Sequence, residues 1–121
     1  MIFNYMMIPG LSYDARNKQD DYTGIKRYMN VIEAVCESTG VSYEMMQSEY
    51  RGRQNVEARA LAFHCIKHFY PDISFTRIGN LFNRNHATVL HGLQKVKDWS
   101  ETDPEFRKKF EKVFREAYLK A

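Results

Sequence analysis

The sequence feature that most constrains the fold is a pair of short helix patterns on either side of Asn83. Apolar residues recur every three or four positions in both patterns, which is the period of a helix that buries one face. Gly79 leaves room where two helices touch, and Asn83 tolerates the left-handed backbone that a tight turn requires. Val89 then faces back onto the first helix. This spacing predicts a helix-turn-helix over about residues 74–99.

The rest of the chain also has helical rather than strand-like patterns, so we predict an all-α fold of about six helices. An irregular N-terminal arm, residues 1–21, is expected to precede a helical domain, residues 22–121. The expected helices cover residues 22–38, a short segment after Ser42, a central helix capped by Asn55 and ending near residue 69, residues 75–82 after Ser74, residues 86–99, and a last helix from Asp103-Pro104.

Neither export nor membrane insertion is indicated by the sequence. No apolar run approaches the roughly 20 residues that span a bilayer. The apolar start, Met1–Leu11, lacks the basic segment of a signal peptide. Cys36 and Cys65 lie in apolar helical contexts, so we expect reduced core thiols rather than a disulfide. The expected location is cytoplasmic, at the nucleoid.

Positive charge is concentrated in the middle of the chain. Residues 51–99 hold eight basic and three acidic side chains, whereas residues 1–50 hold four and seven. A local basic field of this kind favours a polyanionic partner. Uneven surface charge without a partner gives the same count, so charge alone leaves the two interpretations open.

The outer face of the second helix carries residue types that contact DNA. A recognition helix usually reads bases with its N-terminal residues. Asparagine pairs with adenine through two hydrogen bonds, and the methyl groups of alanine and threonine touch the thymine methyl. Short helix pairs also occur as plain packing units, so spacing alone does not decide between them. The candidate base readers are Asn85, His86, Ala87 and Thr88, and the candidate phosphate contacts are Arg53, Ser74, His91 and Lys95.

The chain resembles the C-terminal DNA-binding domain of DnaA, the bacterial chromosomal replication initiator. The resemblance extends from about Val31 to Trp99 and is most specific in the second helix. It implies a helix-turn-helix of the Trp-repressor-like type that binds double-stranded DNA at DnaA-box-like sites, in replication initiation or its regulation. The stretches that carry it are Ala58-Arg59-Ala60, Ile78-Gly79-Asn80-Leu81-Phe82 and Arg84-Asn85-His86-Ala87-Thr88-Val89-Leu90-His91.

The resemblance also implies roles for single residues. Arg51 matches a loop arginine that enters the minor groove, and Arg59 matches an arginine that reaches bases or phosphate from the central helix. The turn at Asn83 is one residue shorter than in the family. Asn85 and Ala87 stand where the family has aspartate and threonine, so the preferred sequence is expected to differ from the usual box. The residues that match the major-groove readers are Arg84, Asn85, His86, Ala87 and Thr88.

No pattern supports ATP binding, catalysis or a metal site. The initiator has an ATPase domain, but no glycine in this sequence is followed by lysine, so a phosphate-binding loop of the Walker type is absent. We predict a stand-alone reader, or a fragment or relative that uses only the reader, with no enzymatic activity and no cofactor. His64 and His68 have a spacing that suits zinc, but a third ligand is not evident.

Two functions therefore stay open. The first is sequence-specific binding of double-stranded DNA. The second is a protein-interaction module on the same fold, which regulates replication proteins through the N-terminal arm or the last helix. The joint presence of Arg51, Arg59 and His86-Ala87-Thr88 favours DNA, because a module that does not bind DNA has no need of all three.

Overall fold

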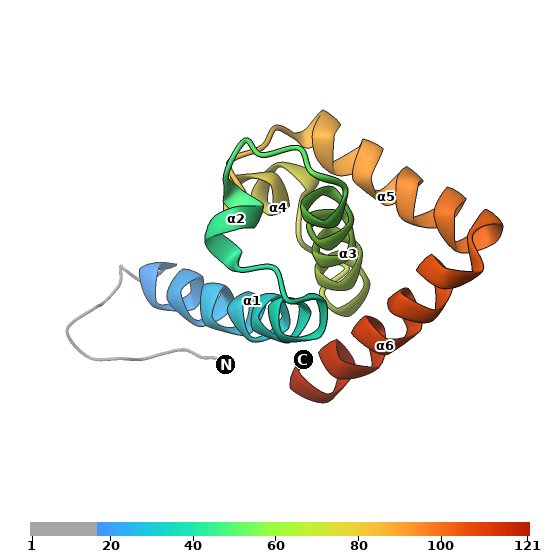
Figure 1. Ribbon diagram of the computed structural model, residues 1–121. Coiled ribbons are helices and arrows are strands. Elements are labelled where there is room, and N and C mark those ends of the chain that lie inside the picture. The colour runs from blue at the N-terminus through green and yellow to red at the C-terminus, as the bar shows by residue number, and fades with distance from the viewer. Residues whose placement is uncertain (1–16) are drawn as a thin grey trace.

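The computed structural model describes the backbone of residues 17–121 and the side chains from Arg27 onward. Within this part the chain forms six helices and no strand, which confirms the predicted all-α class (Figure 1). The helices are α1 Asn17–Thr39, α2 Tyr43–Gln47, α3 Arg53–Phe69, α4 Phe75–Leu81, α5 His86–Thr102 and α6 Pro104–Lys120.

The first helix begins earlier than the sequence pattern predicted. α1 starts at Asn17, so the last five residues of the predicted arm, residues 17–21, are helical. This turn is polar and shows no apolar period, which is why the pattern did not reveal it. The rest of the predicted arm, residues 1–16, lies outside the described part of the chain.

The central helix α3 is in contact with all five other helices (Figure 1). Leu61, Phe63 and Ile66 on this helix are almost completely buried. Gly92 of α5 approaches α3 so closely that a Cβ at this position would lie 2.7 Å from the ring of Phe63. The missing side chain therefore lets α5 cross α3 at short range.

Capping residues explain where two of the helices begin. The side chains of Ser42 and Ser74 accept hydrogen bonds from the backbone N–H groups of Met45 and Arg77, as the sequence predicted. Such a bond satisfies a donor that has no partner within its own helix.

The prediction that Asn55 caps the central helix was wrong. α3 begins two residues earlier, at Arg53, and Asn55 is buried in its first turn. Its side-chain amide donates instead to the carbonyl oxygen of Tyr50, at 2.7 Å. The asparagine therefore connects the helix to the preceding loop through its nitrogen, and its Oδ1, the atom that a cap would use, has no hydrogen-bond partner among the described residues.

The helix-turn-helix is formed by α4 and α5, as predicted. Asn83 has the left-handed backbone that the turn needs, with φ of 59°. A Cβ on Gly79 would lie 2.3 Å from the carbonyl oxygen of Arg84, so only glycine permits the two segments to approach this closely. Val89 is fully buried in the core.

The last helix and both thiols belong to the same core. Phe106, Val113 and Ala117 of α6 are buried. Cys65 is buried and Cys36 is half-buried, and both are free thiols. Burial raises the pKa of Cys65 to about 12, so this thiol is protonated and unreactive at neutral pH. Among the described helices, none has the length and apolar character required to cross a membrane.

Candidate functional site

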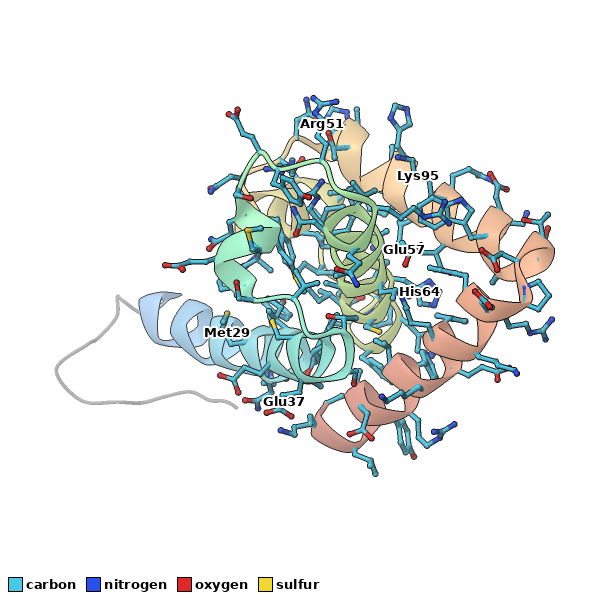
Figure 2. All side chains as sticks on the ribbon, viewed as in Figure 1. Met29, Glu37, Arg51, Glu57, His64 and Lys95 are labelled. Carbon is cyan, nitrogen blue, oxygen red and sulfur yellow. The ribbon has the colours of Figure 1, made fainter. Side chains whose placement is uncertain are left out.

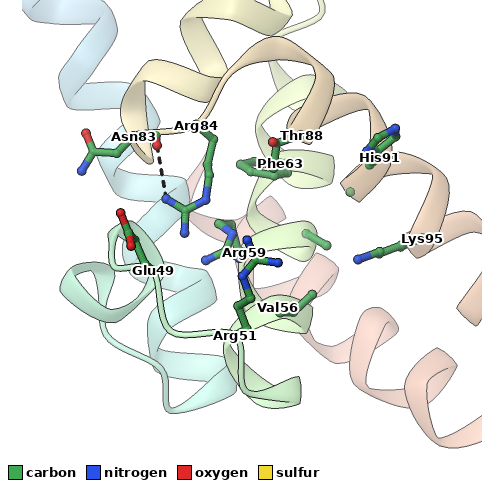
Figure 3. A pocket seen from close by; sticks show the side chains of 12 residues that line it. Glu49, Arg51, Val56, Arg59, Phe63, Asn83, Arg84, Thr88, His91 and Lys95 are labelled. Carbon is green, nitrogen blue, oxygen red and sulfur yellow. Dashed lines mark hydrogen bonds between the residues drawn. The ribbon is translucent and has the colours of Figure 1, made fainter.

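A hollow of about 710 Å³ lies between α5 and the loop that connects α2 to α3 (Figure 3). Three arginines line it, and they come from the loop, from α3 and from the turn of the helix-turn-helix. We call it the arginine hollow. Its lining residues are Glu49, Arg51, Val56, Arg59, Ala60, Phe63, Asn83, Arg84, Thr88, His91, Gly92 and Lys95.

Arg59 is a buried cation in this hollow, with only 8% of its surface exposed. Its Nη1 donates to the carbonyl oxygen of Met46 at 3.0 Å. Burial lowers its pKa, and the positive charges of Arg84 and Arg51 lower it further. A buried charge costs free energy unless a counter-charge compensates it. The site therefore favours an anion beside Arg59.

The loop that carries Arg51 is fixed by contacts close to it. Asn55 holds the carbonyl oxygen of Tyr50, and the ring of Tyr50 lies over Gly52. A Cβ on Gly52 would lie 2.3 Å from this ring. Arg51 itself is exposed, and Figure 2 shows it on the same side of the molecule as Lys95 of α5. The loop and the helix thus present cations in one direction.

Arg84 differs from the other two arginines, because its guanidinium group is bound to backbone oxygens. Nη1 lies 3.1 Å from the carbonyl oxygen of Phe82, 3.2 Å from that of Asn83 and 3.4 Å from that of Gln47. Figure 3 shows the bond to Asn83 as a dashed line. Nη2 donates to the carbonyl oxygen of Ser48. Arg84 therefore joins the turn of the helix-turn-helix to the end of α2.

Two further hydrogen bonds strengthen this connection. The hydroxyl of Tyr43 and the side-chain amide of Gln47 both donate to the carbonyl oxygen of Leu81, at the end of α4. Sequence reasoning did not assign a role to either donor. Their spacing in the sequence carries no signal, because the oxygen that they share lies more than 30 residues away.

The start of α5 presents four of the predicted base readers. Asn85 is its N-cap, and its Oδ1 accepts from the backbone N–H of Thr88 at 2.9 Å and from the Thr88 hydroxyl at 3.1 Å. His86 and Ala87 are exposed and Thr88 is half-buried. One and two turns further along the helix, His91 and Lys95 line the hollow. The structure thus brings Thr88, His91 and Lys95 together with Arg51 and Arg59, whereas Asn85, His86 and Ala87 do not line the hollow.

Two of the predicted phosphate contacts lie elsewhere. Arg53 forms an ion pair with Glu57 at 2.6 Å, and its guanidinium group lies 4.7 Å from the centre of the Trp99 ring. Burial acts to raise the pKa of Glu57, but hydrogen bonds from Lys109 and Arg53 outweigh it, and the pKa is lowered. Ser74 caps α4 and lines a separate hollow of about 490 Å³.

His64 and His68 line a groove of about 660 Å³ between α3 and α6, on another side of α3. Their rings stack 6.1 Å apart, and the ring of Phe110 lies 5.0 Å from that of His64. Within the described residues, no group of three potential ligands could hold a metal ion. We call this feature the apolar groove. Its lining residues are His64, His68, Phe110, Glu111, Phe114, Arg115 and Tyr118.

Over residues 17–121, the geometry defines a class of protein: six helices, with a basic hollow beside the start of the second helix of a helix-turn-helix. The chain belongs to the family described as bacterial DnaA protein helix-turn-helix, which matches residues 28–96. This assignment confirms the family resemblance of the sequence.

Similar proteins from several bacteria are all named chromosomal replication initiator protein DnaA. The chain is 32% identical over 84 residues to the chromosomal replication initiator protein DnaA of Gloeobacter violaceus, and 32% identical over 85 residues to that of Bacteroides thetaiotaomicron. The match covers 69% of this chain in both cases, but only 19% and 18% of those relatives. The chain therefore corresponds to less than a fifth of the length of these initiators.

Proposed function

We propose that this domain binds double-stranded DNA in a sequence-specific manner at DnaA-box-like sites, in replication initiation or its regulation. The observation that carries the proposal is the arginine hollow, in which Arg51, Arg59 and Lys95 face one space beside the start of α5. A single acidic side chain, Glu49, lines the same space. DNA phosphates would supply the negative charge that this arrangement lacks.

The proposed contacts divide between the two grooves of DNA. A recognition helix enters the major groove with its N-terminal residues, and in α5 these are Asn85, His86, Ala87 and Thr88. Arg51 stands on the loop at the other side of the hollow and would reach the minor groove. Arg59 and Lys95, between these elements, would contact phosphates.

Arg84 has a different role in this proposal. Its guanidinium donors are bound to carbonyl oxygens of α2 and of the turn. It would therefore set the distance between the Arg51 loop and α5 rather than read a base. His91 lines the hollow and would add a phosphate contact. Arg53 is instead paired with Glu57, and Ser74 caps α4.

The relatives are named chromosomal replication initiators, which supports a role in replication. The sequence holds no glycine followed by lysine, so the proposal concerns a DNA reader and includes no ATP-dependent step. The nucleoid would be its place of action, and other replication proteins would be its partners there.

The test is binding of labelled duplexes, measured by fluorescence anisotropy at several salt concentrations. Each phosphate contact should contribute about −0.9 to the log–log salt slope. Arg51→Ala should weaken binding and leave discrimination among major-groove bases unchanged. Arg115→Ala removes one exposed arginine from α6 and serves as the matched control, with no change expected in affinity or preference.

Base reading is tested at α5. His86→Ala or Thr88→Ala should reduce discrimination by about 1–3 kcal/mol at one base pair. If the unchanged protein binds no duplex at low salt, the interaction-module alternative is favoured instead.

A further inference from the structure

Asn85 uses its acceptor oxygen inside the protein. Oδ1 receives two hydrogen bonds, from the backbone N–H and from the hydroxyl of Thr88. The orientation of the amide follows from chemistry, because a backbone N–H can only donate and so must face the oxygen. A carbonyl oxygen has two lone pairs, and both are occupied here.

The nitrogen of the same amide has no acceptor among the described residues. Asn85 is exposed at the N-cap of α5, beside the exposed His86 and Ala87. Capping also limits the rotation of the side chain, because turning the amide over would remove the acceptor from Thr88. The domain therefore presents two N–H donors at a fixed place.

We propose that Asn85 reads DNA as a donor only, and that it selects a base with an acceptor edge at one position. This inference rests on the proposed function. An unconstrained asparagine pairs with adenine, because its oxygen accepts from N6 while its nitrogen donates to N7. The cap removes the first of these bonds. Guanine, which presents acceptors at O6 and N7, becomes the preferred base, and cytosine, which presents a donor at N4, is disfavoured.

The sequence and the structure thus give different expectations for one residue. From residue type alone, Asn85 suits adenine. From its hydrogen bonds it suits guanine, which presents two acceptors, ahead of adenine and thymine, which present one each. The two expectations differ because they assume different free donors and acceptors on Asn85. The difference does not depend on how deeply α5 enters the groove.

The test compares two variants that keep the cap. Aspartate and serine cap helices about as well as asparagine, so Asn85→Asp and Asn85→Ser should retain the fold, as thermal unfolding would verify. Asn85→Asp replaces the outward donor by an acceptor. Asn85→Ser removes the outward group altogether. Each protein, as the full 121-residue chain, would select duplexes from a random pool, and affinities would then be measured for all four bases at each selected position.

We expect the unchanged protein to favour guanine over cytosine at one position, by roughly tenfold or more. Asn85→Asp should reverse this preference at that position, and Asn85→Ser should abolish it. The ratio between bases is the readout, because the added negative charge of aspartate lowers affinity for every duplex equally.

Three outcomes contradict the inference. An adenine preference that is lost in Asn85→Asp would show that the amide gives up the cap to pair bidentately. Unchanged preferences in both variants would show that Asn85 does not read a base, while the proposed function still stands. Failure of the unchanged protein to select any sequence would overturn the proposed function together with this inference.

Discussion

The arginine hollow and the apolar groove lie on different sides of α3 and differ in what stabilises them. Rings line the apolar groove and contact one another, as Phe110 contacts His64 and Phe114 contacts His68. These contacts stabilise the groove from within the protein. In the arginine hollow, Arg59 is buried near two other cations, and both neighbours lower its pKa. The crowding of cations opposes folding, whereas the ring contacts in the apolar groove support it.

The largest effect is expected from Gly79→Ala, which acts on the turn beside the arginine hollow. The new methyl group would lie 2.3 Å from the carbonyl oxygen of Arg84, and a backbone atom cannot move aside as a side chain can. The free energy of unfolding should fall by roughly 3 kcal/mol, as measured by chemical denaturation. Gly40→Ala is the control. Unlike Gly79, Gly40 has a positive φ, of 77°, but no atom would lie within 4 Å of a Cβ at this position, so its cost should be about 1–2 kcal/mol, from backbone strain alone.

The second prediction distinguishes the arginine hollow from the apolar groove by its effect on DNA binding. Arg59→Met removes a buried charge from the arginine hollow and should weaken duplex binding by about 10- to 100-fold, since a hydrogen bond to a charged group contributes about 1.5–3 kcal/mol. Phe114→Ala in the apolar groove should reduce stability but leave duplex affinity unchanged. Anisotropy on both purified, folded variants gives the answer. Equal loss of affinity in the two would remove the distinction.

The third prediction concerns the link between the Arg51 loop and α5. Arg84→Met breaks the bonds to the carbonyl oxygens of Gln47 and Ser48, so the loop should lose its fixed place beside the helix. In this background, Arg51→Ala should cost less affinity than it does in the unchanged protein. A double-mutant cycle measures this coupling. Strict additivity of the two changes would argue that Arg84 does not position the loop.

The smallest effect is a pH dependence that belongs to the apolar groove. Burial lowers the pKa of His64, and the charge of His68 lowers it further. The folded state thus binds the proton less tightly than the unfolded state, whose pKa is about 6.5. Stability should be complete above that pH and decrease as the pH falls from 6.5 toward the folded pKa.

Denaturation between pH 7.5 and 5.5 tests this effect and stays above the range in which Glu57 titrates. His64→Gln should flatten the pH dependence. An unchanged slope in His64→Gln would assign the effect to another group.

Several features could be predicted from the sequence because they depend on neighbours in the chain. The left-handed turn at Asn83, the glycine at position 79 and the caps at Ser42 and Ser74 are all local, and the structure confirms them. Asparagine directly before a helical pattern is also a local N-cap signal, and Asn85 does cap α5, although it was predicted only as a base reader.

Other features could not be predicted because their partners are distant. Arg84 meets the end of α2, more than 35 residues away in the sequence. Arg53 meets Glu57 within one turn, but the Trp99 ring that holds its guanidinium group comes from α5. Residue type and spacing give no information about such contacts, which depend on how the helices cross.

The sequence by itself determined the helix order, the helix-turn-helix and the candidate side chains for a DNA interface, since these follow from helical period, turn chemistry and residue type. The tertiary structure decided which donors and acceptors remain available. Arg59 is buried and, within the described part of the chain, has donors without a partner, whereas the donors of Arg84 are bound to carbonyl oxygens. In Asn85 the nitrogen is available to a ligand and the oxygen is already hydrogen-bonded. The physical reason is that a hydrogen-bonding group can serve a ligand only where folding has left it without a partner.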